Sequence, residues 1–182
     1  MLIKKTELTG RSFSLKFRML RVVWIVVNFL CLRYSPKPFF KYRNFFMRLF
    51  GAKIAQTARV NQTAEIWYPG HLSLGENSAI GFGVVLYNQG QVDIGDNVII
   101  SQYAYVCAST HDYHDPLHPL VLAPISISNH VWVCADSFIG PGVTLAEGGV
   151  MGARSVIIKD TLPWGVYAGN PAVNVKKRTV FK

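Results

Sequence analysis

The sequence is poor in several features that identify common classes of protein. Its three cysteines, Cys31, Cys107 and Cys134, form an odd and widely spaced set that fits neither a disulfide framework nor a zinc finger, so we expect reduced thiols and a cytoplasmic protein. No apolar run reaches the roughly twenty residues of a membrane span, since the run at residues 19–32 is shorter and contains an arginine. No small-residue cleavage site follows it, which disfavours a signal peptide.

Acidic residues are almost missing from the first third of the chain. Residues 1–53 hold twelve Lys or Arg and a single acid, Glu7, which gives a charge of +11. Residues 54–182 hold seven bases and nine acids, which gives −2, and the two parts sum to the net charge of +9. The basic field therefore belongs to the N-terminal segment alone.

This basic segment also has apolar residues at helical spacing, in residues 19–32 and again in residues 39–50. Two apolar and basic helices favour contact with a membrane surface through residues 1–50. The alternative is that they pack on the rest of the protein or on a neighbouring subunit. Nothing in the chain is typical of a module that reads nucleic acid, so we expect no nucleic-acid partner.

Residues 54–159 show neither the helical period of 3.6 nor the alternation of a long strand. Instead, an aliphatic residue or a methionine recurs mostly at every sixth position. These residues are Ile54, Val60, Ile66, Leu74, Ile80, Leu86, Ile94, Ile100, Val106, Ile127, Val133, Ile139, Leu145, Met151 and Ile157. The period predicts a coil of three short flat strands, roughly eighteen residues per turn, with these side chains stacked in one inner column.

We therefore expect an all-β solenoid, a parallel β-helix of about five coils, at residues 54–160. Residues 1–53 would form a helical segment and residues 161–182 a C-terminal cap and tail. The rhythm stops once, at residues 112–124, which contain three prolines and are expected to form a loop ejected from the coil.

His111 stands where the regular repeat ends and this loop begins. An imidazole can remove a proton from an alcohol near neutral pH, and a loop inserted into a regular solenoid often carries function. His111, His114 and His118 also form an H-x2-H-x3-H pattern that suggests zinc as an alternative. That pattern lies in a proline-containing loop without a nearby cysteine, so we expect no metal.

Four segments carry a more specific signal. Residues 127–132, 138–145, 151–156 and 169–172 read ISNHVW, FIGPGVTL, MGARSV and GNPA. Together they resemble the hexapeptide-repeat acyltransferases over roughly residues 54–176. The approach to the repeat, LFGAKI, resembles most the colanic-acid-type exopolysaccharide O-acetyltransferases.

The resemblance implies a left-handed parallel β-helix, a homotrimer with active sites between subunits, and acetyl-CoA as co-substrate. It implies that His111 is the general base and that the acetyl group passes directly to the acceptor. Ala135 and Ala153 would contact the pantetheine arm through their backbones, and Trp132 would line the site near the thioester. The basic side chains that would face the CoA phosphates are Lys159 and Lys176.

The acceptor site departs from the family pattern. Where the maltose and galactoside branch holds its sugar with an Asn and an Asp, this chain has Gly81 and Asn88. We therefore expect an acceptor other than the simple sugars of that branch, in a pocket lined by Tyr87, Asn88 and Asp112.

The resulting hypothesis is an acetyl-CoA-dependent O-acetyltransferase that modifies a sugar hydroxyl in exopolysaccharide or capsule biosynthesis. It would work at the inner face of the cell membrane on a sugar or a lipid-linked oligosaccharide. The alternatives are an N-acetyltransferase of an amino sugar, a serine O-acetyltransferase, and a solenoid scaffold without catalysis.

Overall fold

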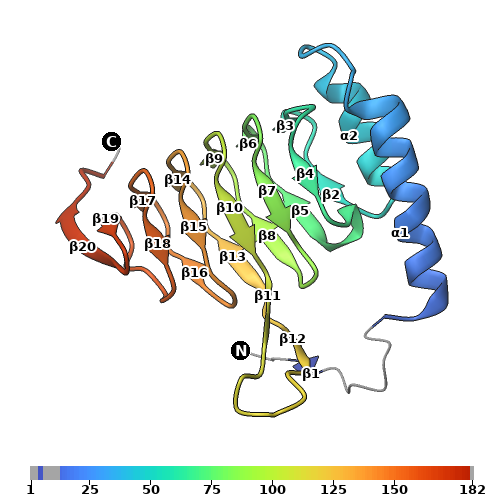
Figure 1. Cartoon of the computed structure of the whole chain (residues 1–182). Helices are drawn as coiled ribbons and strands as arrows, with labels where there is room; N and C mark the ends of the chain where they lie inside the picture. Colours follow the sequence, from blue (N-terminus) through green and yellow to red (C-terminus); the bar gives the residue numbers. More distant parts are fainter. Residues whose placement is uncertain (1–3, 6–12, 181–182) are drawn as a thin grey trace.

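The computed structural model describes residues 4–5 and 13–180, and its main part is a stack of triangular coils with two helices at one end (Figure 1). Sheet I consists of β2 (Lys53–Ile54), β5 (Leu72–Leu74), β8 (Val92–Ile94), β13 (Ile125–Ile127) and β16 (Thr144–Leu145). Sheet II consists of β3 (Arg59–Val60), β6 (Ala79–Ile80), β9 (Ile99–Ile100), β14 (Trp132–Val133), β17 (Val150–Met151), β19 (Gly165–Gly169) and β20 (Ala172–Lys177). Sheet III consists of β4 (Glu65–Ile66), β7 (Val85–Tyr87), β10 (Tyr105–Cys107), β15 (Phe138–Ile139) and β18 (Val156–Ile157).

The strand register confirms the six-residue period. Ile54 pairs with Leu74, and Ile94 pairs with Ile127 across the inserted residues, so each interval returns an aliphatic side chain to the same wall. Five full coils result, as predicted, and β19 adds one strand of a sixth. Apart from the antiparallel pair of β19 and β20, neighbouring coil strands are parallel, which is consistent with the left-handed coil.

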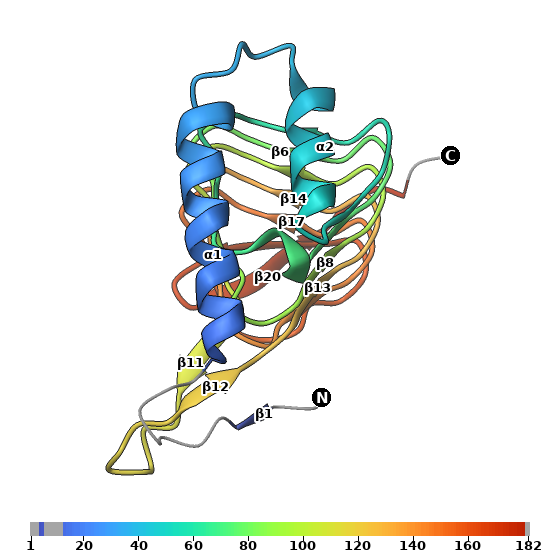
Figure 2. The ribbon, with the colours of Figure 1, turned by 90° about the vertical axis from the view of Figure 1, so that its right-hand side faces the viewer.

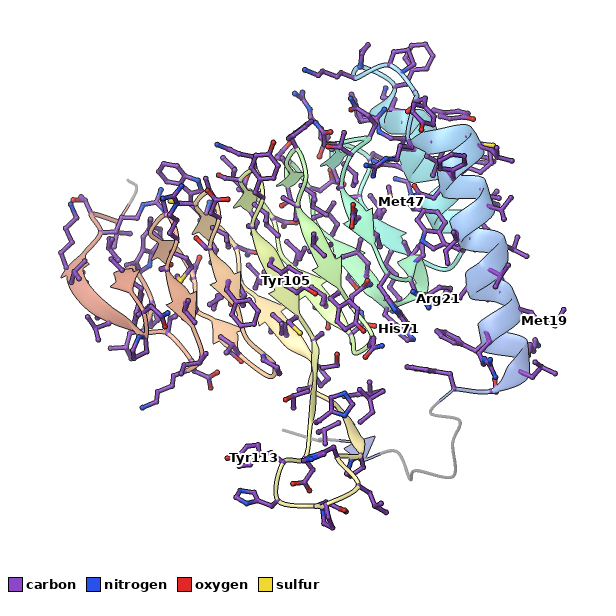
Figure 3. All side chains as sticks on the ribbon, in the orientation of Figure 1. Met19, Arg21, Met47, His71, Tyr105 and Tyr113 are labelled. Atoms are coloured by element: carbon purple, nitrogen blue, oxygen red, sulfur yellow. The ribbon has the colours of Figure 1, made fainter. Side chains whose placement is uncertain are left out.

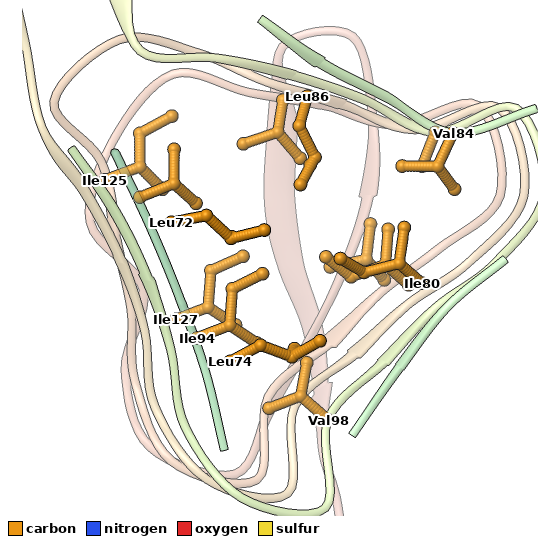
Figure 4. Packing of buried hydrophobic residues seen from close by; sticks show 14 of the residues in the cluster. Leu72, Leu74, Ile80, Val84, Leu86, Ile94, Val98, Ile125 and Ile127 are labelled. Atoms are coloured by element: carbon orange, nitrogen blue, oxygen red, sulfur yellow. The ribbon is translucent and has the colours of Figure 1, made fainter. Parts of the chain in front are cut away.

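The recurring aliphatic side chains fill the inside of the triangle (Figure 4). Leu86, Val106, Ile139 and Leu145 have no exposed surface, and the remaining members of the column are buried as well. Each coil thus buries apolar surface against the next one, which is the main favourable term in folding this architecture.

Two helices cover the first coil, side by side in the view along the solenoid (Figure 2). Helix α1 (Leu15–Val27) continues as a π-helical segment (Asn28–Leu32), and α2 (Phe40–Leu49) follows after a proline-containing turn, as predicted. Within the described part of the chain, no helix has both the length and the hydropathy for a membrane crossing.

The side chains of these helices complete the hydrogen bonding of the first coil. In the walls, backbone N–H groups of one coil donate to carbonyl groups of the next, as Ala55 N does to Leu74 O at 2.9 Å. The first coil therefore presents carbonyl oxygens that no preceding coil can satisfy. Four side-chain donors from the helices reach them: Trp24 Nε1 to Ile66 O (2.8 Å), Arg43 Nε to Val60 O (2.9 Å), Asn44 Nδ2 to Ala58 O (2.7 Å) and Arg48 Nε to Ile54 O (2.8 Å).

The last coil shows the complementary arrangement, because its wall presents N–H groups. Thr144 N donates to Asp160 Oδ1 at 2.7 Å, and Ala146 N donates to Thr161 Oγ1 at 2.9 Å. Donor side chains therefore cap one end of the solenoid, and acceptor side chains bond to N–H groups near the other.

The inserted segment differs from the expected irregular loop. It forms a hairpin of β11 (Ser109–His111) and β12 (Leu120–Leu122) that projects from the corner between sheets III and I. The short strand β1 (Lys4–Lys5) adds to the free edge of β12. Residues 120–122 form a strand because their backbone pairs with β11. The sequence did not predict this strand, since these residues lie in a proline-containing segment.

Replacing Arg43 by methionine tests the capping of the first coil. Arg43 is buried and also donates to Pro36 O and Lys37 O, so Arg43→Met leaves several carbonyls without a donor. We expect the free energy of unfolding to fall by roughly 1–3 kcal/mol in urea titration. Lys41→Met, at an exposed position of the same helix, should change it by less than about 0.5 kcal/mol. Equal effects of the two substitutions would contradict the capping role.

Candidate active site

His111 is the last residue of β11 and its imidazole is exposed. Nδ1 lies 2.6 Å from the carbonyl oxygen of His118, across the hairpin. A carbonyl only accepts, so Nδ1 carries the hydrogen and donates it, and in the neutral ring Nε2 is left with its lone pair. The hairpin thus fixes both the orientation of the ring and the nitrogen that can accept a proton.

Asp112 organises the turn that follows. Its N–H donates to Pro119 O at 3.0 Å, and its Oδ1 accepts from His114 N at 3.1 Å. Across the described ranges, no group of three or more His, Cys, Asp or Glu side chains is arranged to hold a metal ion. His118 serves His111 through its backbone carbonyl.

Ala135 and Ala153 occupy the same corner, between sheets II and III, on adjacent coils. The Arg154 N–H donates to Ala135 O at 2.9 Å, which links the two turns. Within the described residues, neither alanine donates its own N–H to a backbone carbonyl. Both N–H groups can therefore meet an acceptor on a ligand that lies along this corner.

Three other predicted residues lie on the outside of the solenoid. Trp132 is 45% exposed on the face of sheet II, and its Nε1 donates to Ser101 Oγ at 3.0 Å. Lys159 is exposed just after β18, and Lys176 is exposed on β20, opposite Val166. These basic side chains leave their ammonium groups on the surface of the last coils.

The predicted residues do not form one cluster within a single chain. His111 projects from the corner between sheets III and I, whereas Ala135 and Ala153 lie at the corner between sheets II and III. A site that uses both groups therefore needs residues from two corners of the triangular cross-section.

Asn88, which we expected to contact the acceptor, joins two coils in this structure. Its side chain is fully buried, where Nδ2 donates to Tyr68 O at 2.7 Å and Oδ1 accepts from Tyr68 N at 3.2 Å. The amide is therefore used to join two coils. The neighbouring Tyr87 does face outward, and its hydroxyl accepts from Gln89 Nε2 at 3.1 Å.

The cysteines near these positions are poorly suited to act as nucleophiles. Burial raises the pKa of the Cys134 thiol, which disfavours the thiolate that attacks in covalent catalysis. Cys107 donates its S–H to Ser109 O at 3.2 Å. The chemistry available at the hairpin is therefore that of the imidazole.

One feature that the sequence reasoning missed is a groove between α1 and sheet III. Arg21 lines it from the helix, and Trp67 and Tyr87 line it from the sheet. The signal was present in two places: Arg21 interrupts an apolar run, and each aromatic residue directly follows an inward-facing aliphatic residue.

No family model matches the chain. It is 36% identical to the putative colanic acid biosynthesis acetyltransferase WcaF of Escherichia coli K12 over 156 residues, which cover 86% of each protein. A galactoside acetyltransferase in complex with coenzyme A has a similar fold, with a TM-score of 0.84 and 24% identity over 93% of this chain and 86% of that one. A hexapeptide-repeat acetyltransferase of Vibrio cholerae in complex with acetyl coenzyme A has a TM-score of 0.82 and 22% identity over 93% of each chain.

The six-residue repeat, the three parallel sheets and the ejected hairpin define a hexapeptide-repeat solenoid. The chain belongs to the hexapeptide-repeat acetyltransferases, in the same family as WcaF.

Replacing Asn88 tests its structural role. Asn88→Ala leaves the N–H and the carbonyl of Tyr68 without their partner, so we expect the free energy of unfolding to fall by about 1–3 kcal/mol in urea titration. The KM for the acceptor should stay unchanged. Gln102→Ala, at an exposed turn position, serves as the control with little effect on either quantity. A raised KM for the acceptor with an unchanged free energy of unfolding would show that Asn88 contacts the acceptor.

Proposed function

We propose that this protein transfers an acetyl group from acetyl-CoA to a sugar hydroxyl, with His111 as the general base. The observation that carries the proposal is the hydrogen bond from His111 Nδ1 to His118 O, which leaves Nε2 as the basic atom. Nε2 removes the proton of the hydroxyl while its oxygen attacks the thioester carbonyl carbon. The carbon–sulfur bond then breaks, and the imidazolium returns its proton to the departing sulfur.

The surface residues on the neighbouring corner suit the co-substrate. The N–H groups of Ala135 and Ala153 would bond to the amide oxygens of the pantetheine arm or to the developing oxyanion. Trp132 would cover the thioester, and Lys159 and Lys176 would face the phosphates. Two structural neighbours are complexes with coenzyme A or acetyl coenzyme A, which supports this assignment.

The separation of His111 from Ala135 and Ala153 supports a homotrimer with sites between subunits. In such an arrangement the hairpin of one subunit brings its imidazole to the alanine corner of the next. The site would be incomplete in an isolated chain.

The acceptor is proposed from the relative whose name connects it with colanic acid. We expect a sugar hydroxyl of an exopolysaccharide or capsule intermediate, either free or lipid-linked, with Tyr87 and Asp112 near the bound sugar. Tyr87 lies close to the hairpin, because it is paired with Cys107 at the end of β10.

The outer face of α1 supports contact with the cytoplasmic surface of the membrane. Together with its π-helical continuation, it exposes about half or more of each of six apolar side chains, which we call the outer stripe: Leu15, Met19, Val22, Val23, Val26 and Leu30. Lys16 and Arg18 are exposed beside it, and no acidic residue occurs between Glu7 and Glu65. An apolar helix face with a basic rim is suited to lie in the interface of an anionic bilayer.

The catalytic proposal predicts a large loss of activity in His111→Ala. We expect the rate of acetyl transfer to lipid-linked glycan intermediates, followed by mass spectrometry, to fall by about 10² to 10⁴-fold. The fold and the number of subunits in the oligomer should be unchanged, because this side chain is exposed. His114→Ala, in the same hairpin, should retain activity.

The same assay separates the proposed acceptor from its alternatives. Amino sugars and serine, supplied in place of the glycan, should be acetylated poorly. Rapid acetylation of either one would reject the sugar O-acetyltransferase assignment, and full activity of His111→Ala would reject the general base.

The membrane proposal predicts that polar substitutions in the outer stripe weaken vesicle binding. The double variant Val22→Ser/Val26→Ser should lower partitioning into phosphatidylglycerol-containing vesicles by at least about ten-fold, because two apolar side chains no longer enter the interface. Val173→Ser/Val175→Ser makes the same chemical change at exposed positions of β20 and should have no effect. Equal co-sedimentation of both variants would contradict a role of α1.

A further inference from the structure

The groove between α1 and sheet III combines a cation with aromatic surface. Its helix wall includes Arg21, Asn28 and Arg33, and its floor includes Trp67 and Tyr87. Figure 3 shows Arg21 on the side of α1 that faces the sheet, whereas Met19 points away from it. The groove thus lies behind the outer stripe, on the inner side of the same helix.

Arg21 differs from the arginines that cap the first coil. Arg43 and Arg48 donate their N–H groups to backbone carbonyls. Arg21 instead lies over the ring of Trp67, 4.2 Å from its centre, and its Nε is buried without an acceptor among the described residues. A shielded guanidinium donor without an acceptor costs free energy, so this arrangement favours the binding of an anion.

The stacked position of Arg21 also suits anion binding geometrically. A guanidinium held by its face on an aromatic ring can direct its terminal N–H groups toward a carboxylate or phosphate. The other groove cation, Arg33, already has a carboxylate near it, with Nη1 3.7 Å from Glu65 Oε1. Among the described residues, Arg21 is therefore the arginine of the groove without an ion-pair partner.

A row of aromatic side chains continues from the groove along sheet III. Trp67, Tyr87, Tyr105 and Phe138 lie on four successive coils, with ring centres 6.4, 6.4 and 5.8 Å apart. Coils spaced at about 4.8 Å give the row a length of roughly 14 Å, which matches a short oligosaccharide. Sugar rings present C–H groups that pack on the negative faces of aromatic rings.

We propose that this groove and the aromatic row bind an anionic saccharide, with its charged group at Arg21 and its sugar rings along the row. The inference rests on the proposed function and specifies the acceptor class of that site. His111 lies four residues beyond Cys107, the partner of Tyr87, so the row passes the base of the catalytic hairpin. The anion is either the diphosphate of a glycosyl diphosphate or the carboxylate of a uronic acid.

Acetyl transfer to three soluble probes tests the proposal: a trisaccharide 1-diphosphate, a trisaccharide ending in glucuronic acid, and maltotriose. One of the two anionic probes is expected to serve as the acceptor. For that probe, Arg21→Gln should raise the KM by about ten- to a hundred-fold and leave kcat unchanged, because a charge-assisted contact is lost. The KM for maltotriose should not change. Lys41→Gln removes a positive charge at an exposed position of α2 and should leave all three values unchanged.

Further measurements serve as controls. Tyr87→Leu should weaken the binding of all three probes, and urea titration should show that each variant is folded. Calorimetric titration of His111→Ala measures probe binding without turnover, so a failure of the catalytic proposal is distinguishable from a failure of this one. Tighter binding of either anionic probe than of maltotriose supports the groove and identifies the anion. Equal binding of all three probes, or equal effects of Arg21→Gln and Lys41→Gln, overturns the proposal.

Discussion

The direction of the backbone hydrogen bonds in the walls governs much of this molecule. Each wall strand donates N–H groups to the carbonyls of the next coil, so the wall strands of the first coil present acceptors outward. Arginine, asparagine and tryptophan on the two helices supply the missing donors. This requirement gives a physical reason for part of the strongly basic composition of residues 1–53. From the sequence, we favoured contact with a membrane and kept packing on the rest of the protein or on a neighbouring subunit as the alternative. Lys16 and Arg18, exposed beside the outer stripe, donate to no carbonyl of the first coil among the described residues.

The fold was predictable because its signal is local and repeated. Fifteen aliphatic and methionine positions at a near-constant spacing specify three walls and one inner column, and the register confirms them even across the inserted hairpin, where Ile94 meets Ile127. The helices were predictable for the same reason. The antiparallel pairing inside the hairpin was not predictable, because a proline-containing segment shows little periodicity of its own.

The site was predictable only in part. The sequence identifies His111 as a residue at a break in the repeat, but only the structure shows which nitrogen is basic, since that depends on the carbonyl of His118 across the hairpin. Asn88 shows the opposite limit. Its position suggested sugar binding, yet a polar side chain buried between coils must bond to backbone, and Tyr68 provides both partners. Arg21 required the structure as well, because stacking on Trp67 joins residues from two distant segments.

The capped first coil has a consequence for how copies of this chain can associate. A bare edge of a parallel solenoid is a template on which another solenoid could add end to end, and repetition of that contact would produce filaments. The two helices occupy the carbonyl edge, and the antiparallel β19–β20 hairpin closes part of the opposite end. Addition of another solenoid is thereby blocked at the end that carries the helices, so contacts between copies at that end of the molecule would have to use the lateral walls and corners instead.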